Sequence, residues 1–266
     1  MRASTDRGFV ELTLDELTID DERSFRDIAL VAELKDVLRR ARCRFRVLPS
    51  SQAGRWDRAL LLNLTFWGTD GGGDVLVDDH LAADVVVHAA WHHLAAKALP
   101  HPSGARASAE AMFLGEAIAS AYDIHLVGRL IGRRQESSFL ETQVPAMAEA
   151  AKSAGLSDGA FEEMLLGVAA DPERAFEDLR ALLLDSMTGL FACRSAEEGL
   201  AALALLERRR FGCLLHHYEL STWVLYARAH GGPEADPRVG EIDRALRAAP
   251  DALEWLTSHW VRPALG

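Results

Sequence analysis

Two histidines and a glutamate are the residues of this 266-residue chain best suited to chemistry. His88 and His92 are four residues apart in a segment with helical apolar periodicity, so both imidazole rings project from one helix face. Two imidazoles on one face can converge on a single metal ion. Glu116 follows in a second apolar segment, predicted to be the next helix. A helical hairpin would bring its carboxylate opposite the histidines as a third ligand.

A second group of polar side chains lies at residues 213–223, near the start of another predicted helix. His216 and Glu219 are three residues apart, a spacing that lets both side chains meet one metal ion. His217 and Tyr218 lie between them. The alternative interpretation is a polar stripe on an amphipathic helix.

The first group resembles the metal site of the gluzincin metallopeptidases, the enzymes related to thermolysin. In that family a strand and a turn lead into a helix with the HExxH motif, and a later helix supplies a glutamate. Here a strand-like segment at 59–67 and an Asp-Gly-Gly-Gly-Asp turn at 70–74 precede His88-Ala-Ala-Trp-His92, and Glu116 follows. The resemblance covers about residues 59–125. It implies a zincin-like core in which His88, His92 and Glu116 are zinc ligands.

The chain departs from the family pattern at two positions. Ala89 stands where HExxH has the glutamate that deprotonates the metal-bound water. Ser120 stands where the family has an acidic supporting residue, and Asp123, one turn further on, can orient a histidine by accepting its free N–H. A metal site tolerates both changes. A metallopeptidase mechanism needs another carboxylate as the base.

The resemblance also implies a role for the second group. Downstream His and Tyr residues of gluzincins hydrogen-bond an oxyanion, which makes His217 and Tyr218 candidate catalytic residues. If the two segments converge, Glu219 is the best replacement for the base missing at position 89. General acid–base help contributes about 10²–10⁴-fold, so we expect zinc binding with poor hydrolysis of generic peptides.

A non-enzymatic interpretation competes with this one. With ten histidines, a chance pair at spacing four occurs in roughly one chain in three. Neutral histidines also sit in cores with satisfied ring nitrogens. The alternative is therefore a helical scaffold or regulatory protein, whose C-terminal helices form an interaction surface. In either case the expected substrate or partner is a peptide or protein.

The predicted fold is mainly α, with a small antiparallel β element at 44–78 and a helical C-terminal half. We expect residues 1–154, with the metal helices, and residues 155–266 to pack as one unit. Apolar periodicity and capping residues predict helices that begin at Ser24, at Asp79 or His80, at Ser103 or Ser108, at Ser157, at Asp171 and at Ser195. Two further helices are expected at 214–230 and 237–248, and a short last one after Pro250.

Composition indicates which partners the protein can bind and in which cellular compartment it is expected. The net charge of −11 argues against nucleic acid as a main partner. Three widely spaced cysteines cannot build a disulfide framework, which favours a reducing compartment. The N-terminal residues lack a secretory h-region, and no apolar window reaches 18 residues. We therefore expect a cytoplasmic protein without membrane contact.

Overall fold

The structure is a computed structural model that describes residues 9–52, 55, 75–101, 106–232 and 234–266. Its helices are α1 (Glu22–Phe25), α2 (Ala29–Ala41), α4 (Ala83–Ala98), α5 (Ala109–Gly132), α6 (Ser138–Ser153), α7 (Asp158–Ala170), α8 (Pro172–Ala192), α9 (Ala196–Leu206), α10 (His217–His230), α11 (Pro237–Ala248), α12 (Ala252–Leu256) and α13 (Arg262–Leu265). The strands are β1 (Val10–Thr13), β2 (Thr18–Asp20), β3 (Arg44–Val47), β4 (Val75–Leu76) and β5 (His80–Ala82). The prediction of a mainly α fold is confirmed.

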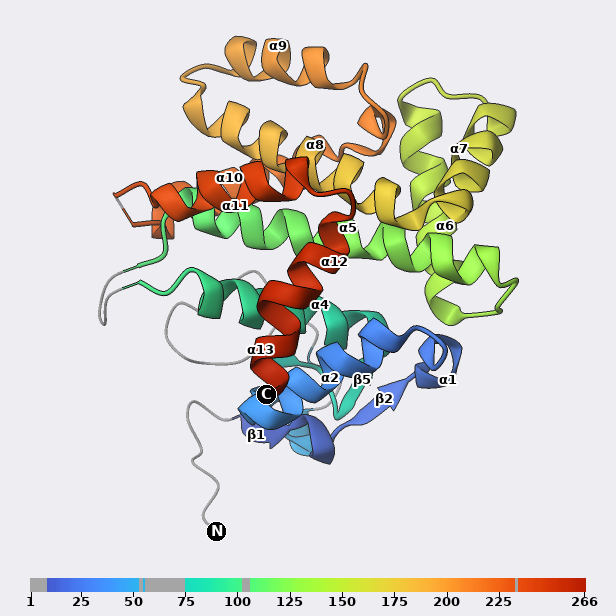
Figure 1. Cartoon of the computed structure of the whole chain (residues 1–266), viewed down its shortest axis with the longest axis vertical. Coiled ribbons are helices and arrows are strands. Elements are labelled where there is room, and N and C mark those ends of the chain that lie inside the picture. Colours follow the sequence, from blue (N-terminus) through green and yellow to red (C-terminus); the bar gives the residue numbers. More distant parts are fainter. Residues whose placement is uncertain (1–8, 53–54, 56–74, 102–105, 233) are drawn as a thin grey trace.

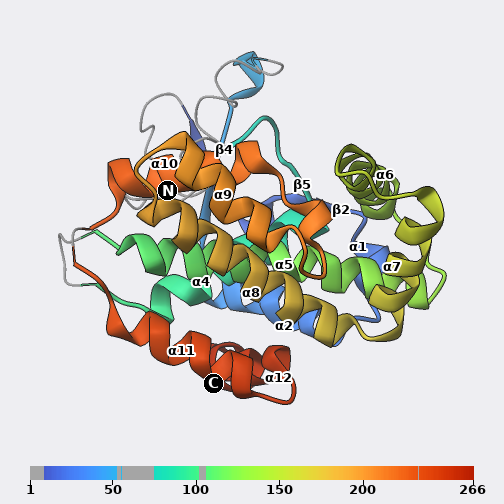
Figure 2. The same cartoon turned by 90° about the horizontal axis from the view of Figure 1, so that it is seen from above.

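Helix α5 lies at the centre of the molecule (Figures 1 and 2). It packs against α4 on one side and against α7 and α8 on the other, so its side chains are buried along nearly its whole length. Gly128 allows the close approach of α7, because a Cβ there would lie 2.6 Å from the Val168 carbonyl oxygen. The contacts of α5 with α7 and α8 join the two predicted parts of the chain across residue 154.

The β structure is small and only partly as expected. Strand β3 pairs antiparallel with β1 and parallel with β4. Strand β5 pairs parallel with β2. The antiparallel pairing therefore uses residues 10–13, which the sequence analysis did not assign, because a four-residue strand has too few alternating positions to stand out. The predicted strand at 59–67 and the turn at 70–74 lie outside the described residues.

Capping residues located most helix starts correctly. The side chains of Ser108, Ser157, Asp171 and Ser195 each accept a hydrogen bond from a backbone N–H in the first turn of α5, α7, α8 and α9. The Glu198 side chain accepts from the backbone N–H of Arg194, so it closes the turn just before the Ser195 cap. These local interactions are readable from the sequence because both partners lie within four residues.

Three predicted helix boundaries are wrong. The predicted helix that begins at Ser24 is divided into α1 and α2, because Ile28 adopts an extended backbone (φ −101°, ψ 95°) that interrupts the helix. The helix expected at Asp79 or His80 begins at Ala83, since residues 80–82 pair with β2. The helix expected at Leu214 is a 3₁₀ turn there, and α10 begins only at His217.

Within the part of the chain that the structure describes, no helix is both long and apolar enough to cross a membrane.

Candidate metal centre

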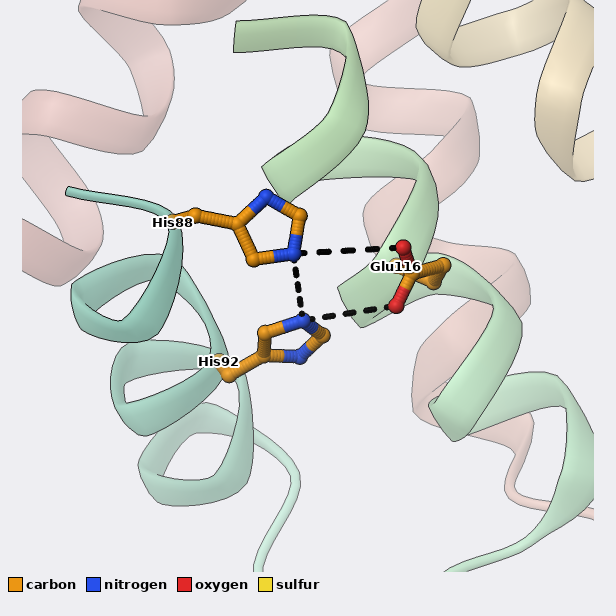
Figure 3. Close-up of side chains that lie close together, drawn as sticks. All are labelled: His88, His92 and Glu116. Atoms are coloured by element: carbon orange, nitrogen blue, oxygen red, sulfur yellow. Dashed lines mark hydrogen bonds and ion pairs between the residues drawn. The ribbon is translucent and has the colours of Figure 1, made fainter. Parts of the chain in front are cut away.

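Helix α4 presents its two histidines on one face, as the spacing predicts. The neighbouring face of α4 is buried through Val87, Trp91 and Leu94, which fixes the rotation of the helix. The Nε2 atoms of His88 and His92 lie 3.1 Å apart (Figure 3). Their side chains are 15% and 21% exposed, so both rings lie at the edge of the core rather than within it.

Helix α5 brings Glu116 to the same point. Its carboxylate is buried and faces both rings, with Oε2 3.3 Å from His92 Nε2 and Oε1 3.9 Å from His88 Nε2 (Figure 3). The neighbouring Gly115 allows α4 and α5 to approach, because a Cβ at that position would lie 3.3 Å from the Ala95 Cβ. The predicted helical hairpin therefore exists, and it places the Glu116 carboxylate opposite the histidine pair.

Ser120 supports the glutamate. Its hydroxyl donates a hydrogen bond of 2.8 Å to Glu116 Oε1 from one turn further along α5. This contact holds the orientation of the carboxylate, which is the usual task of groups that support a metal ligand. Ser120 was predicted as a supporting residue on the basis of the family resemblance, and in the structure its side chain contacts Glu116.

The three donor groups have the dimensions of a metal site. One ligand atom from each of His88, His92 and Glu116 lies within 4.8 Å of the others. Ligands bound to one tetrahedral zinc ion at about 2.05 Å are about 3.3 Å from each other. The measured separations of 3.1, 3.3 and 3.9 Å are close to that value. Small side-chain rotations would therefore complete the geometry.

The electrostatics favour a neutral histidine at this point. Burial and the neighbouring His92 lower the pKa of His88 to about 4, and Glu116 opposes the shift only in part. His88 is thus uncharged at neutral pH, and a neutral imidazole is the form that coordinates a metal.

A pocket of about 300 Å³ reaches Ser120, the residue that hydrogen-bonds Glu116. Its described lining comes from α5, α6, α8, α10 and the turn before α10: Ser120, Asp123, Ile124, Val127, Gln143, Met147, Leu179, Leu183, Leu214, His216, Glu219, Leu220 and Trp223. Ser120 belongs to both features, because it hydrogen-bonds Glu116 and lines the pocket.

Asp123 lies in this pocket rather than against a histidine. Among the described residues it makes no hydrogen bond, so the structure does not place it in the histidine-orienting role that the sequence suggested. Burial raises the pKa of its carboxyl well above the ordinary value, and the nearby charges of Asp84 and Glu116 add to the shift.

The second predicted group is split by the start of α10. His216 and Glu219 line the pocket, so Glu219 shares a cavity with Ser120. His217 instead lies 3.4 Å from Glu207, and Tyr218 is 75% exposed. The structure therefore places Glu219 in the same pocket as Ser120, whereas His217 and Tyr218 are not part of its described lining.

Two features near the site were not foreseen. His93 has its Nδ1 3.4 Å from the Cys43 sulfur. Helix α6, which supplies Gln143 and Met147 to the pocket, was not predicted, although Leu140, Val144, Met147 and Ala151 recur at helical spacing. Pro145 within that segment hides the signal, since proline is rare inside helices.

Comparison of the chain with protein-family models, with curated proteins and with solved structures finds no match.

Proposed function

We propose that this protein binds one zinc ion through His88, His92 and Glu116, in a centre like that of the gluzincin metallopeptidases. The observation that carries the proposal is the convergence of three donor groups from two helices within 4.8 Å. Two imidazoles and one carboxylate form a typical zinc ligand set. The hydrogen bond from Ser120 to Glu116 adds the support that such ligands usually have.

The proposed activity is that of an altered or degenerate metal-dependent hydrolase. Zinc with three protein ligands keeps a fourth position for water and lowers the pKa of that water towards about 7. Ala89 cannot act as a base. Glu219 is our candidate for that role, since it lines the pocket that Ser120 joins to the metal centre. Weak hydrolysis of generic peptides is the expected result.

Metal analysis of protein purified without a histidine tag tests the proposal. We expect about one equivalent of zinc, lost in the His88→Ala/His92→Ala double variant. Wild-type protein should also melt at a higher temperature when zinc is added, because a ligand that binds only the folded state stabilises it. Wild-type protein that holds no metal and melts at the same temperature with and without zinc would overturn the proposal.

The base assignment has its own test. Residual casein hydrolysis should disappear on chelation and in Glu219→Gln, while the zinc content of that variant stays unchanged. Hydrolysis that needs the metal but is indifferent to Glu219→Gln would refute the role of Glu219.

A second candidate function is a non-enzymatic helical scaffold. The observation that favours it is a set of exposed leucines on the C-terminal helices: Leu200 and Leu205 on α9 and Leu225 on α10 are 63%, 74% and 62% exposed. If these side chains form one contiguous patch, that patch is a surface for protein contacts. Protein free of metal in the analysis above, with these leucines needed for a protein complex, would favour the scaffold.

A further inference from the structure

The pocket beside the metal centre combines an apolar wall with negative charge. Most of its described lining is aliphatic or aromatic, including Leu183, Leu220 and Trp223. The charged side chains in that lining are the carboxylates of Asp123 and Glu219, and neither forms an ion pair or hydrogen bond with another described residue. No Lys or Arg is part of the described lining.

The two carboxylates lie at different depths. Asp123 lies beside the buried Ile124 and Val127 on α5, whereas Glu219 lies in the exposed first turn of α10. The α10 amide groups stabilise Glu219, since negative charge is favoured at a helix N-terminus. Asp123 lies in the middle of α5 and has no such support. A cation bound in the pocket would therefore gain most from Asp123.

The size and position of the pocket limit the ligand. Its volume of about 300 Å³ equals the space of about ten water molecules, enough for a small ligand or one amino-acid side chain. Seven residues of α5 separate Asp123 from Glu116, about 10 Å along the helix, and Ser120 lies between them. A ligand held at Asp123 can thus extend past Ser120 towards the metal ligands.

We propose that this pocket binds a small apolar ligand that carries one ammonium group, with the ammonium beside Asp123 and the apolar body against Leu183, Leu220 and Trp223. Charge complementarity selects the cation, because a carboxylate in an apolar pocket attracts it more strongly than the same pair in water. Trp223 adds an aromatic face, which also favours ammonium groups. If the protein is the hydrolase proposed above, its preferred substrates would carry an apolar group with an ammonium. This extension to substrates rests on the proposed function.

Calorimetric titration with three six-carbon probes tests the pocket: hexylamine, 1-hexanol and hexanoate, at pH 8. The protein is used both zinc-loaded and after dialysis against a chelator, since an amine can also bind a metal directly. In both forms we expect hexylamine to bind at least about tenfold more tightly than hexanol, because hydrogen bonds to charged groups are the strong ones. Hexanoate should bind most weakly.

Variants assign the effect to one carboxylate. Asp123→Asn should abolish the preference for the amine and leave hexanol binding unchanged. Glu241→Gln, an exposed glutamate on α11 outside the described lining, is the matched control and should keep the preference. Equal binding of amine and alcohol by the metal-free wild-type protein would overturn the inference, as would an amine preference that survives in Asp123→Asn.

The outcome separates this inference from the proposed function. Amine selectivity in a protein that never binds zinc would refute the metal centre but keep the pocket. Zinc binding without amine selectivity would keep the metal centre and refute the pocket.

Discussion

The two histidine-containing groups of this protein look alike in sequence and differ in structure. Both place a histidine and a second polar side chain three or four residues apart at a helix. The α4 pair lies against α5, so a buried carboxylate reaches both rings. At the start of α10 the side chains of His216, His217, Tyr218 and Glu219 are all exposed.

The difference shows what two suitably spaced residues on a helix need in order to form a metal site. Spacing puts two ligands on one face, but the third must come from another element held at close range. Gly115 and Ala95 provide that close range between α4 and α5. In the described part of the chain, His88, His92 and Glu116 are the three side chains that could hold a metal ion and meet this condition.

Zinc affinity offers the largest test of this comparison. His88→Ala/His92→Ala should weaken zinc binding by about 10⁴-fold or more, because two of three protein ligands are lost from a site whose binding free energy is on the order of 10 kcal/mol. Competition titration with a chelating indicator measures the change. His216→Ala/His217→Ala is the matched control and should bind zinc as the wild type does. A comparable loss in the control would mean that the α10 histidines hold the metal.

Restoring the missing base should have the next largest effect. Ala89→Glu is expected to raise chelator-sensitive casein hydrolysis by about 10²–10⁴-fold, the usual contribution of a positioned general base. The Gln side chain is nearly as large as that of Glu but has no basic carboxylate. Ala89→Gln should therefore leave the rate of hydrolysis at the wild-type level. Equal rates in the two variants would show that the carboxylate at position 89 is not what the centre lacks.

The support of the metal ligand can be tested on each helix. Ser120→Ala removes the hydrogen bond to Glu116 Oε1 and should weaken zinc binding by about 10–100-fold. Ser221→Ala on α10 is the counterpart, since Ser221 donates to the His217 carbonyl oxygen and has no contact with the triad. Calorimetry should give an unchanged zinc affinity for it. If Ser120→Ala binds zinc as tightly as the wild type, the hydrogen bond from Ser120 does not support the metal ligand.

The smallest expected effect is a change in thermal stability. Removing a carboxylate should stabilise the protein on α5 and destabilise it on α10. Burial raises the pKa of Asp123, so the metal-free protein loses stability as the pH rises above about 4, where the unfolded-state carboxyl ionises. Asp123→Asn removes this loss and should raise the melting temperature at pH 8 by a few degrees, given roughly 2–4 °C per kcal/mol for a chain of this size. Near pH 4 the difference should vanish.

Glu219→Gln supplies the contrast in that experiment. It removes a carboxylate from the first turn of α10, where the helix dipole favours negative charge, so it should lower the melting temperature slightly at pH 8. Thermal unfolding followed by circular dichroism measures both variants. Destabilisation by Asp123→Asn at pH 8 would contradict the assigned cost of its charge.

Much of the fold was predictable because helix signals are local. Ser108, Ser157, Asp171 and Ser195 mark helix starts through bonds to residues three positions away. One error falls where a distant partner intervenes. Residues 80–82 look helical but pair with β2, some 60 residues earlier.

The sequence by itself determined the histidine pair, because a spacing of four on a helix has one geometric outcome. It also determined that position 89 offers no base, since Ala89 has no ionisable group. Only the tertiary structure decided that Glu116 reaches the pair, that Ser120 donates to it, and that Asp123 faces a pocket instead of a ring. The physical reason is that these contacts depend on how α4, α5 and α10 are rotated and spaced, which the packing of many distant side chains sets together.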